Sequence, residues 1–125
     1  MREKHRILRT RALALRERAR VLEDAFLDPA TRRCVEHLLL GIEEELAWLD
    51  ANGDTAPLPQ VAAFLPGTTD AVGLLEGVLR KDGANAGLKH ALAHVPDLSR
   101  ALVRASGEPA ARRNRSAVAP GLGAD

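Results

Sequence analysis

Two histidines, His90 and His94, stand four residues apart in a stretch that reads as a helix. Side chains with this spacing share one helix face and can hold a metal ion between their imidazoles. Asp97 could add a carboxylate, and His37 or a glutamate of another helix could complete the site across a bundle. We nevertheless expect a solvated or partner-facing pair and no metal site, with metal binding as the alternative. Against a metal, Ala91 stands where a zincin has its glutamate, and no Glu-x-x-His pair is present.

The other polar residues do not indicate catalysis. Glu43, Glu44 and Glu45 are adjacent, so they point in three directions around a helix, whereas acid–base catalysis needs two carboxylates that converge on one substrate. No Ser/His/Asp or Cys/His arrangement has the spacing of an enzyme family, and the glycine-rich stretches lack the lysine and strand context of a phosphate loop. We therefore expect a non-enzymatic protein that uses no cofactor.

The element that must position these residues is a long helical hairpin, predicted over residues 3–51. Its first helix carries an apolar stripe at alternating spacings of four and three residues: Leu8, Ala12, Leu15, Ala19, Leu22 and Phe26. Its second helix carries a similar stripe: Val35, Leu39, Ile42, Leu46 and Leu49. Two such stripes pack along a narrow seam.

The turn of this hairpin is predicted at Asp28-Pro29. Asp28 suits the N-cap of the second helix and Pro29 suits its first position, and so short a connection implies antiparallel helices. The second helix should end at Gly53, with that glycine in the left-handed conformation.

Charge is distributed unevenly along the hairpin. Residues 1–33 contain ten Lys and Arg against five Asp and Glu, whereas residues 34–70 contain seven Asp and Glu and no Lys or Arg. Folding the hairpin predicts three ion pairs across it: Arg9 with Asp50, Arg16 with Glu43 and Arg11 with Glu45. The alternative is that the basic face of the first helix binds nucleic acid, through Arg9, Arg11, Arg16 and Arg18.

Shorter helices should follow the hairpin and complete one helical domain over residues 1–105. Residues 54–69 read as a Pro-rich connector that packs on Trp48, although a ligand pocket there is the alternative. Over residues 70–105 we expect a helix capped by Thr68 or Thr69 and then a second helix, broken near residue 96 by a proline. Gly73 and Gly77 each cost about 1 kcal/mol in an exposed helix, so another helix should approach them closely.

Residues 106–125 are predicted to be a disordered tail, because this stretch has almost nothing to bury. It contains a small basic cluster: Arg112, Arg113 and Arg115. This cluster could contact nucleic-acid phosphates or an acidic partner, or it could simply keep the tail solvated.

Composition bounds the remaining possibilities. The chain has 125 residues, a formal net charge of +1 and few aromatic residues, which favours an all-α fold with an aliphatic core. Its one cysteine, Cys34, excludes an internal disulfide and reads as a small packing residue in a reducing compartment. No apolar run is long enough to span a bilayer, and we expect no secretory signal. The predicted location is cytoplasmic, with no membrane partner.

The segment from Ala12 to Asp50, which includes LDPATRRCVEHLLLGIEEELAWLD, resembles the C-terminal dimerisation helices of PadR-type bacterial transcriptional regulators. It covers under a third of the chain and consists of heptad residues. Such regulators carry first a winged-helix domain, which has no counterpart in this sequence. The resemblance implies a role in protein interaction.

The sequence thus predicts a small helical bundle that serves as a non-enzymatic interaction or regulatory protein. It would be an adaptor that docks on a protein partner or a module that associates with itself. Nucleic-acid binding is the alternative function, and metal binding by the bundle is a further one.

Overall fold

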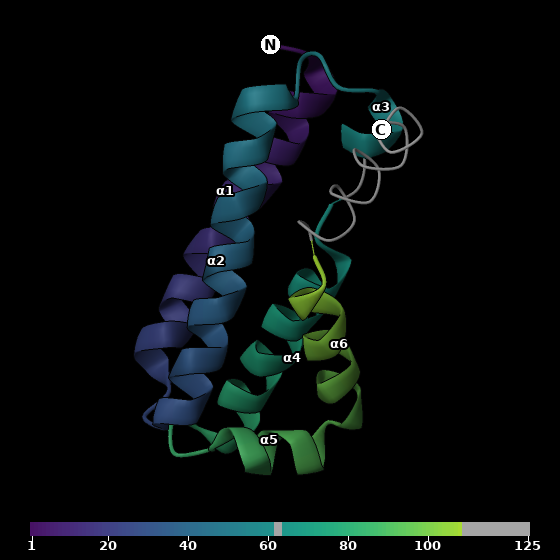
Figure 1. Cartoon of the computed structure of the whole chain (residues 1–125). Helices are drawn as coiled ribbons and strands as arrows, with labels where there is room; N and C mark the ends of the chain where they lie inside the picture. Colours follow the sequence, from purple (N-terminus) through teal and green to yellow (C-terminus); the bar gives the residue numbers. More distant parts are fainter. Residues whose placement is uncertain (62–63, 109–125) are drawn as a thin grey trace.

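The computed structural model describes residues 1–61 and 64–108. These residues form helices and no strand, which confirms the predicted all-α class. The helices, shown in Figure 1, are α1 (Glu3–Ala25), α2 (Pro29–Asn52), α3 (Leu58–Val61), α4 (Pro66–Asp82), α5 (Leu88–His94) and α6 (Pro96–Ser106). α1 and α2 form the long hairpin, α4 and α6 form a second antiparallel pair beside it, and α5 joins that pair near the hairpin turn.

The seam between α1 and α2 agrees with the prediction along α1 and differs along α2. All six predicted seam residues of α1 are buried. On α2, Leu39 stays partly exposed, whereas Leu38 and Glu45 are buried. α2 packs against α1 on one side and against α4 and α6 on another, so its buried face is wider than the seam of an isolated hairpin. Glu45, which was predicted to pair with Arg11, is fully buried, whereas Arg11 is exposed.

Two of the predicted ion pairs cross the hairpin. Arg9 Nε lies 3.0 Å from Asp50 Oδ1, and Arg16 Nη1 lies 3.4 Å from Glu43 Oε1. The side chains in these pairs are partly exposed, so each pair contributes only about 0–1 kcal/mol. The apolar seam provides the stability, and the charges select its register.

Asp28 connects the hairpin turn to α5. Its carboxylate accepts a hydrogen bond from the backbone N–H of Thr31 at 2.9 Å and another from the Thr31 hydroxyl at 2.9 Å, which confirms the predicted N-cap. It also accepts a longer one from the N–H of Leu88 at 3.4 Å, at the first residue of α5. These bonds, first of all the one from the Thr31 N–H, hold the pKa of Asp28 below its ordinary value.

The substitution Asp28→Asn should make the protein less sensitive to acid. A carboxyl whose pKa is lowered by folding stabilises the folded state above its unfolded pKa, and that contribution is lost as the pH falls through its folded pKa. Asparagine caps helices almost as well but does not titrate in this range, so the variant should keep most of its stability at neutral pH. Urea unfolding from neutral pH to about pH 3 should show a shallower loss of stability than in wild type. An equally steep loss would contradict this role of Asp28.

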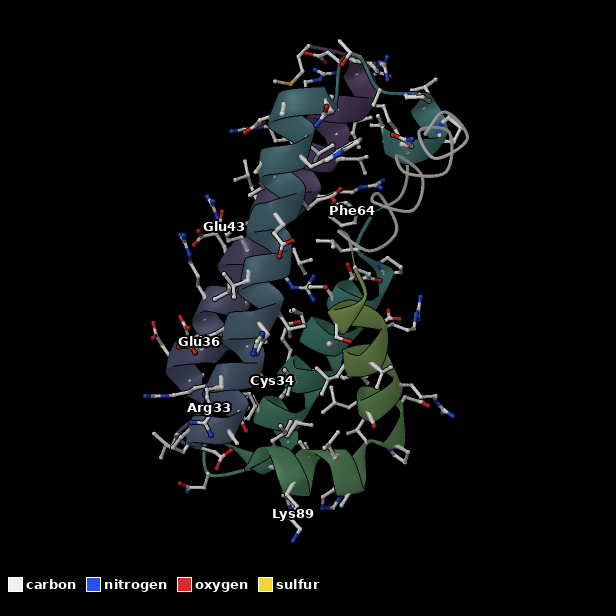
Figure 2. All side chains as sticks on the ribbon, in the orientation of Figure 1. Arg33, Cys34, Glu36, Glu43, Phe64 and Lys89 are labelled. Carbon is white, nitrogen blue, oxygen red and sulfur yellow. The ribbon has the colours of Figure 1, made fainter. Side chains whose placement is uncertain are left out.

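The connector packs on the open end of the hairpin, as predicted. Val61 is buried with Leu8 and Leu49, and Trp48 and Phe64 pack against this cluster (Figure 2). The connector contains one short helix, α3, at Leu58–Val61.

Gly53 ends α2 in a different conformation from the predicted one. Its φ of −61° and ψ of −25° are right-handed helical values, so the left-handed cap is wrong. The position requires glycine because of a close approach: a Cβ on Gly53 would lie 2.6 Å from the ring of His5. His5 is buried there, with Nδ1 3.1 Å from Asp54 Oδ1.

α4 begins earlier than predicted and is capped from a distant part of the chain. Pro66 occupies its first turn, and neither predicted threonine is the N-cap. Instead the carboxylate of Glu108 accepts hydrogen bonds from the N–H of Gly67 at 2.7 Å and from the N–H and hydroxyl of Thr68, both at 3.2 Å. Glu108 therefore belongs to the folded domain, and the prediction of a tail from residue 106 is wrong for residues 106–108. Residues 109–125 of that predicted tail lie outside the described residues.

Candidate functional site

An open groove runs along the outer face of α4. Its first part has a volume of about 570 Å³ and is bordered by α6. The side chains of this part are Thr69, Asp70, Gly73, Leu74, Asp97, Arg100, Ala101 and Arg104. A second part of about 180 Å³ continues along the same face to the end of α5, where Lys81, Asp82 and His94 line it.

The floor of this groove contains the two glycines that were predicted to meet another helix. A Cβ built on Gly73 meets no atom within 4 Å, and one built on Gly77 meets only Arg80, at 3.9 Å. Within the described residues no helix approaches these positions closely, so for this part of the chain the prediction is wrong. The close contact between α4 and α6 occurs instead at Gly67, where a Cβ would lie 2.5 Å from the backbone nitrogen of Ala105.

Charges of both signs border the groove. Asp70 stands at the N-terminal end of the α4 face, where Arg104 Nη1 lies 3.2 Å from its Oδ2. Lys81 stands at the C-terminal end of the same face, because eleven residues make just over three whole helical turns. On α6, Arg100 forms an ion pair with Asp97. The groove therefore has Asp70 with Arg104 at one end and Lys81 with Asp82 at the other, so that along α4 itself Asp70 and Lys81 stand at opposite ends.

The predicted metal candidates are brought together only in part. His90 and His94 are neighbours on α5, with ring centroids 4.3 Å apart. Asp97 lies beyond the break at Pro96, where it pairs with Arg100. A carboxylate that the sequence analysis did not select takes its place: Asp82, at the end of α4, forms a group with the two histidines whose possible ligand atoms all lie within 4.8 Å of one another.

The arginines proposed for nucleic-acid binding are largely used in ion pairs. Arg9 and Arg16 pair with α2, and Arg18 Nη2 lies 2.6 Å from Glu76 Oε1 on α4, while Arg11 is exposed. The hydrogen bond from Arg18 lowers the pKa of Glu76 and raises that of Arg18. The three tail arginines lie outside the described residues. Nucleic-acid binding thus stays a prediction.

Cys34 lies on the side of α2 that faces the second helical pair (Figure 2). It lines a further pocket, between α2 and α6, of about 530 Å³, together with His37, Leu40 and Leu102. Partial burial raises the pKa of its thiol, which disfavours the reactive thiolate. This environment agrees with the interpretation of Cys34 as a packing residue.

No model of a protein family, no curated protein and no solved structure matches this chain. Among the described residues, no helix is both long and apolar enough to cross a membrane. The function must therefore be argued from the chain's own geometry.

Proposed function

We propose that this chain is a non-enzymatic, self-associating helical module of the cytoplasm. In the proposed dimer, the α4 faces of two copies pack against each other in antiparallel orientation across a two-fold axis. The observation that carries this proposal is the open groove over Gly73 and Gly77.

The two glycines lower the stability of the free chain. A glycine in an exposed helix costs about 1 kcal/mol relative to alanine, and within the described residues nothing packs on Gly73 to offset that cost. Small residues four apart on one helix face allow a second helix to approach closely. A second copy of α4 placed there would bring Gly73 of one chain opposite Gly77 of the other.

The charges on the same face favour this occupant and this direction. In an antiparallel pair, Asp70 of one copy lies near Lys81 of the other, and two-fold symmetry makes the contact twice. A parallel pair would place like charges opposite each other. Antiparallel alignment also sets the opposite ends of the two helix dipoles side by side.

The flanking helix completes the packing. α6 borders the groove on one side, so an incoming α4 would contact α6 as well as α4. Two copies would then form a four-helix arrangement in which the two α4 helices are the closest pair and the two α6 helices the outer pair. Glycines suit the closest pair because its helix axes must approach most.

Reversing the charges tests this arrangement. Asp70→Lys should weaken association by about threefold to tenfold, because two ion pairs of about 0–1 kcal/mol each become repulsive contacts. Adding Lys81→Glu to the same chain should restore it, since the exchanged charges again face each other. The single variant Asp70→Lys and the double variant both lose the ion pair between Asp70 and Arg104 within one chain. A difference in association between them therefore reports only the contact between the two copies.

Dissociation constants for wild type, both single variants and the double variant, measured by light scattering at low salt, give the result. A double variant weaker than either single variant would contradict the antiparallel register, and a wild type that stays monomeric at every concentration would contradict self-association.

A further inference from the structure

The helix ends at the far end of the α4 groove bring two imidazoles and a carboxylate together. Asp82 is the last residue of α4, and Gly83 turns the chain with a φ of +83°, a value that favours glycine. α5 then begins at Leu88, held to the hairpin turn by the hydrogen bond from its N–H to Asp28. The buried Ala91 anchors the inner face of α5. These contacts position the backbone of the residues that carry the three side chains: Asp82, His90 and His94.

The spacing of the three side chains suits one metal ion. His90 Nε2 lies 3.8 Å from Asp82 Oδ2, and the possible ligand atoms of the group lie within 4.8 Å of one another. Ligands about 2.0–2.1 Å from a tetrahedral ion lie about 3.3 Å apart. The group therefore needs an inward rotation of its side chains, which His90, 47 % exposed, has room to make toward the more buried Asp82.

The three side chains have few other partners. Among the ion pairs of the described residues, Asp82 pairs with His90 and with no lysine or arginine. By contrast, Asp97 follows the histidines in sequence but is held by Arg100. The carboxylate at residue 82 is thus available to an ion, whereas the one predicted from sequence is already neutralised.

From this geometry we propose that Asp82, His90 and His94 bind one divalent transition-metal ion of the zinc class. Two imidazole nitrogens with one carboxylate suit zinc, cobalt, nickel or copper, whereas calcium and magnesium prefer an all-oxygen set. The site would have three protein ligands, of which Asp82 and His94 also line the second part of the groove. The inference does not depend on self-association, because all three ligands come from one chain.

Titration of the untagged full chain with Co²⁺, followed by its visible absorption, and with Zn²⁺, followed by calorimetry, tests the site. We expect one ion per chain in wild type. Loss of an outer partner of a metal ligand typically weakens binding by about 10–100-fold, so Asp82→Asn, His90→Ala and His94→Ala should each weaken it at least that much. Because these side chains are partly exposed, the variants should keep the helical circular dichroism spectrum of wild type.

Two matched controls identify the ligands. Asp97→Asn removes the other carboxylate close to the histidines in sequence, and His37→Ala removes an exposed histidine of α2. Both should bind the ion as wild type does. Absence of stoichiometric binding in wild type would overturn the proposal, as would equal binding by wild type and the three ligand variants. A loss of binding in Asp97→Asn equal to that in Asp82→Asn would also overturn it.

Discussion

Replacement of Phe26 with alanine should lower the free energy of unfolding by about 3–5 kcal/mol. Phe26 is fully buried where α1 ends, at the point where the hairpin turn meets the second helical pair. The substitution removes its apolar contacts and leaves a cavity that surrounding helices cannot fill completely. Small domains have only about 5–15 kcal/mol of stability, so this one change should remove a large share of it.

The neighbouring residue is the control for this prediction. Leu27 is 60 % exposed, and its structural contribution is a backbone hydrogen bond to Ala84 that alanine keeps. Leu27→Ala should therefore change the stability by about 0.5 kcal/mol or less. Phe26→Leu, expected to cost about 1–1.5 kcal/mol, extends the test if the alanine variant does not fold. Urea unfolding measures all three, and equal losses at residues 26 and 27 would contradict the position of the core.

The substitution Gly73→Gln should have opposite effects on folding and on association. Glutamine is a good helix former and its Cβ meets open space, so the free energy of unfolding of a single chain should rise by about 0.5–1 kcal/mol. The same side chain occupies the surface on which we propose that the second α4 packs. Bulk inserted into a close-packed contact costs about 1–3 kcal/mol, and two-fold symmetry repeats the contact, so the dissociation constant should rise by about thirtyfold or more.

Gly41 provides the matched control. It also lies inside a helix, and a Cβ on it meets nothing within 4 Å, but it is on α2 and lines the pocket between α2 and α6. Gly41→Gln should raise the stability by a similar amount and leave association unchanged. If Gly73→Gln and Gly41→Gln weakened association equally, the contact between copies would not be at Gly73. If Gly73→Gln lowered the free energy of unfolding, the groove would not be open at Gly73.

The sequence predicted the hairpin well because its determinants are local. The stripe of α1 repeats within a few residues, and Asp28 and Pro29 form the turn from adjacent positions. The stripe of α2 was less accurate. Leu38 is buried in the core that α2 shares with α4 and α6, which lie far away in sequence. Glu45 is also buried, and periodicity within α2 alone does not encode either burial.

The candidate site depended on contacts that local patterns do not contain. The cap of α4 comes from Glu108, about forty residues away, so a search for a capping threonine could not find it. Asp82 lies close to His90 and His94 only because the chain turns at Gly83 and α5 then crosses near the end of α4. In the sequence, Asp82 directly precedes Gly83, and this pair indicates only the end of a helix. It does not indicate that the carboxylate lies close to the two histidines.

The spacing of Gly73 and Gly77 predicted that another helix packs closely on this face of α4. It did not predict which helix that is. Sequence alone cannot distinguish a helix of the same chain from a helix of a second copy. Among the described residues, the close contact of α4 with another helix is at Gly67, whereas no atom lies within 4 Å of a Cβ on Gly73, so we favour a second copy there. That distinction is the basis of the proposed dimer.

Sedimentation equilibrium of the wild-type chain, beside Gly73→Gln and Gly41→Gln, tests the central proposal most directly. It measures molecular mass in solution without assuming a shape. Wild type and Gly41→Gln should fit a reversible monomer–dimer equilibrium, whereas Gly73→Gln should have the 13.4 kDa mass of one chain over the same concentrations. A wild type with the mass of one chain throughout, or a Gly73→Gln variant that dimerises as wild type does, would contradict self-association through α4.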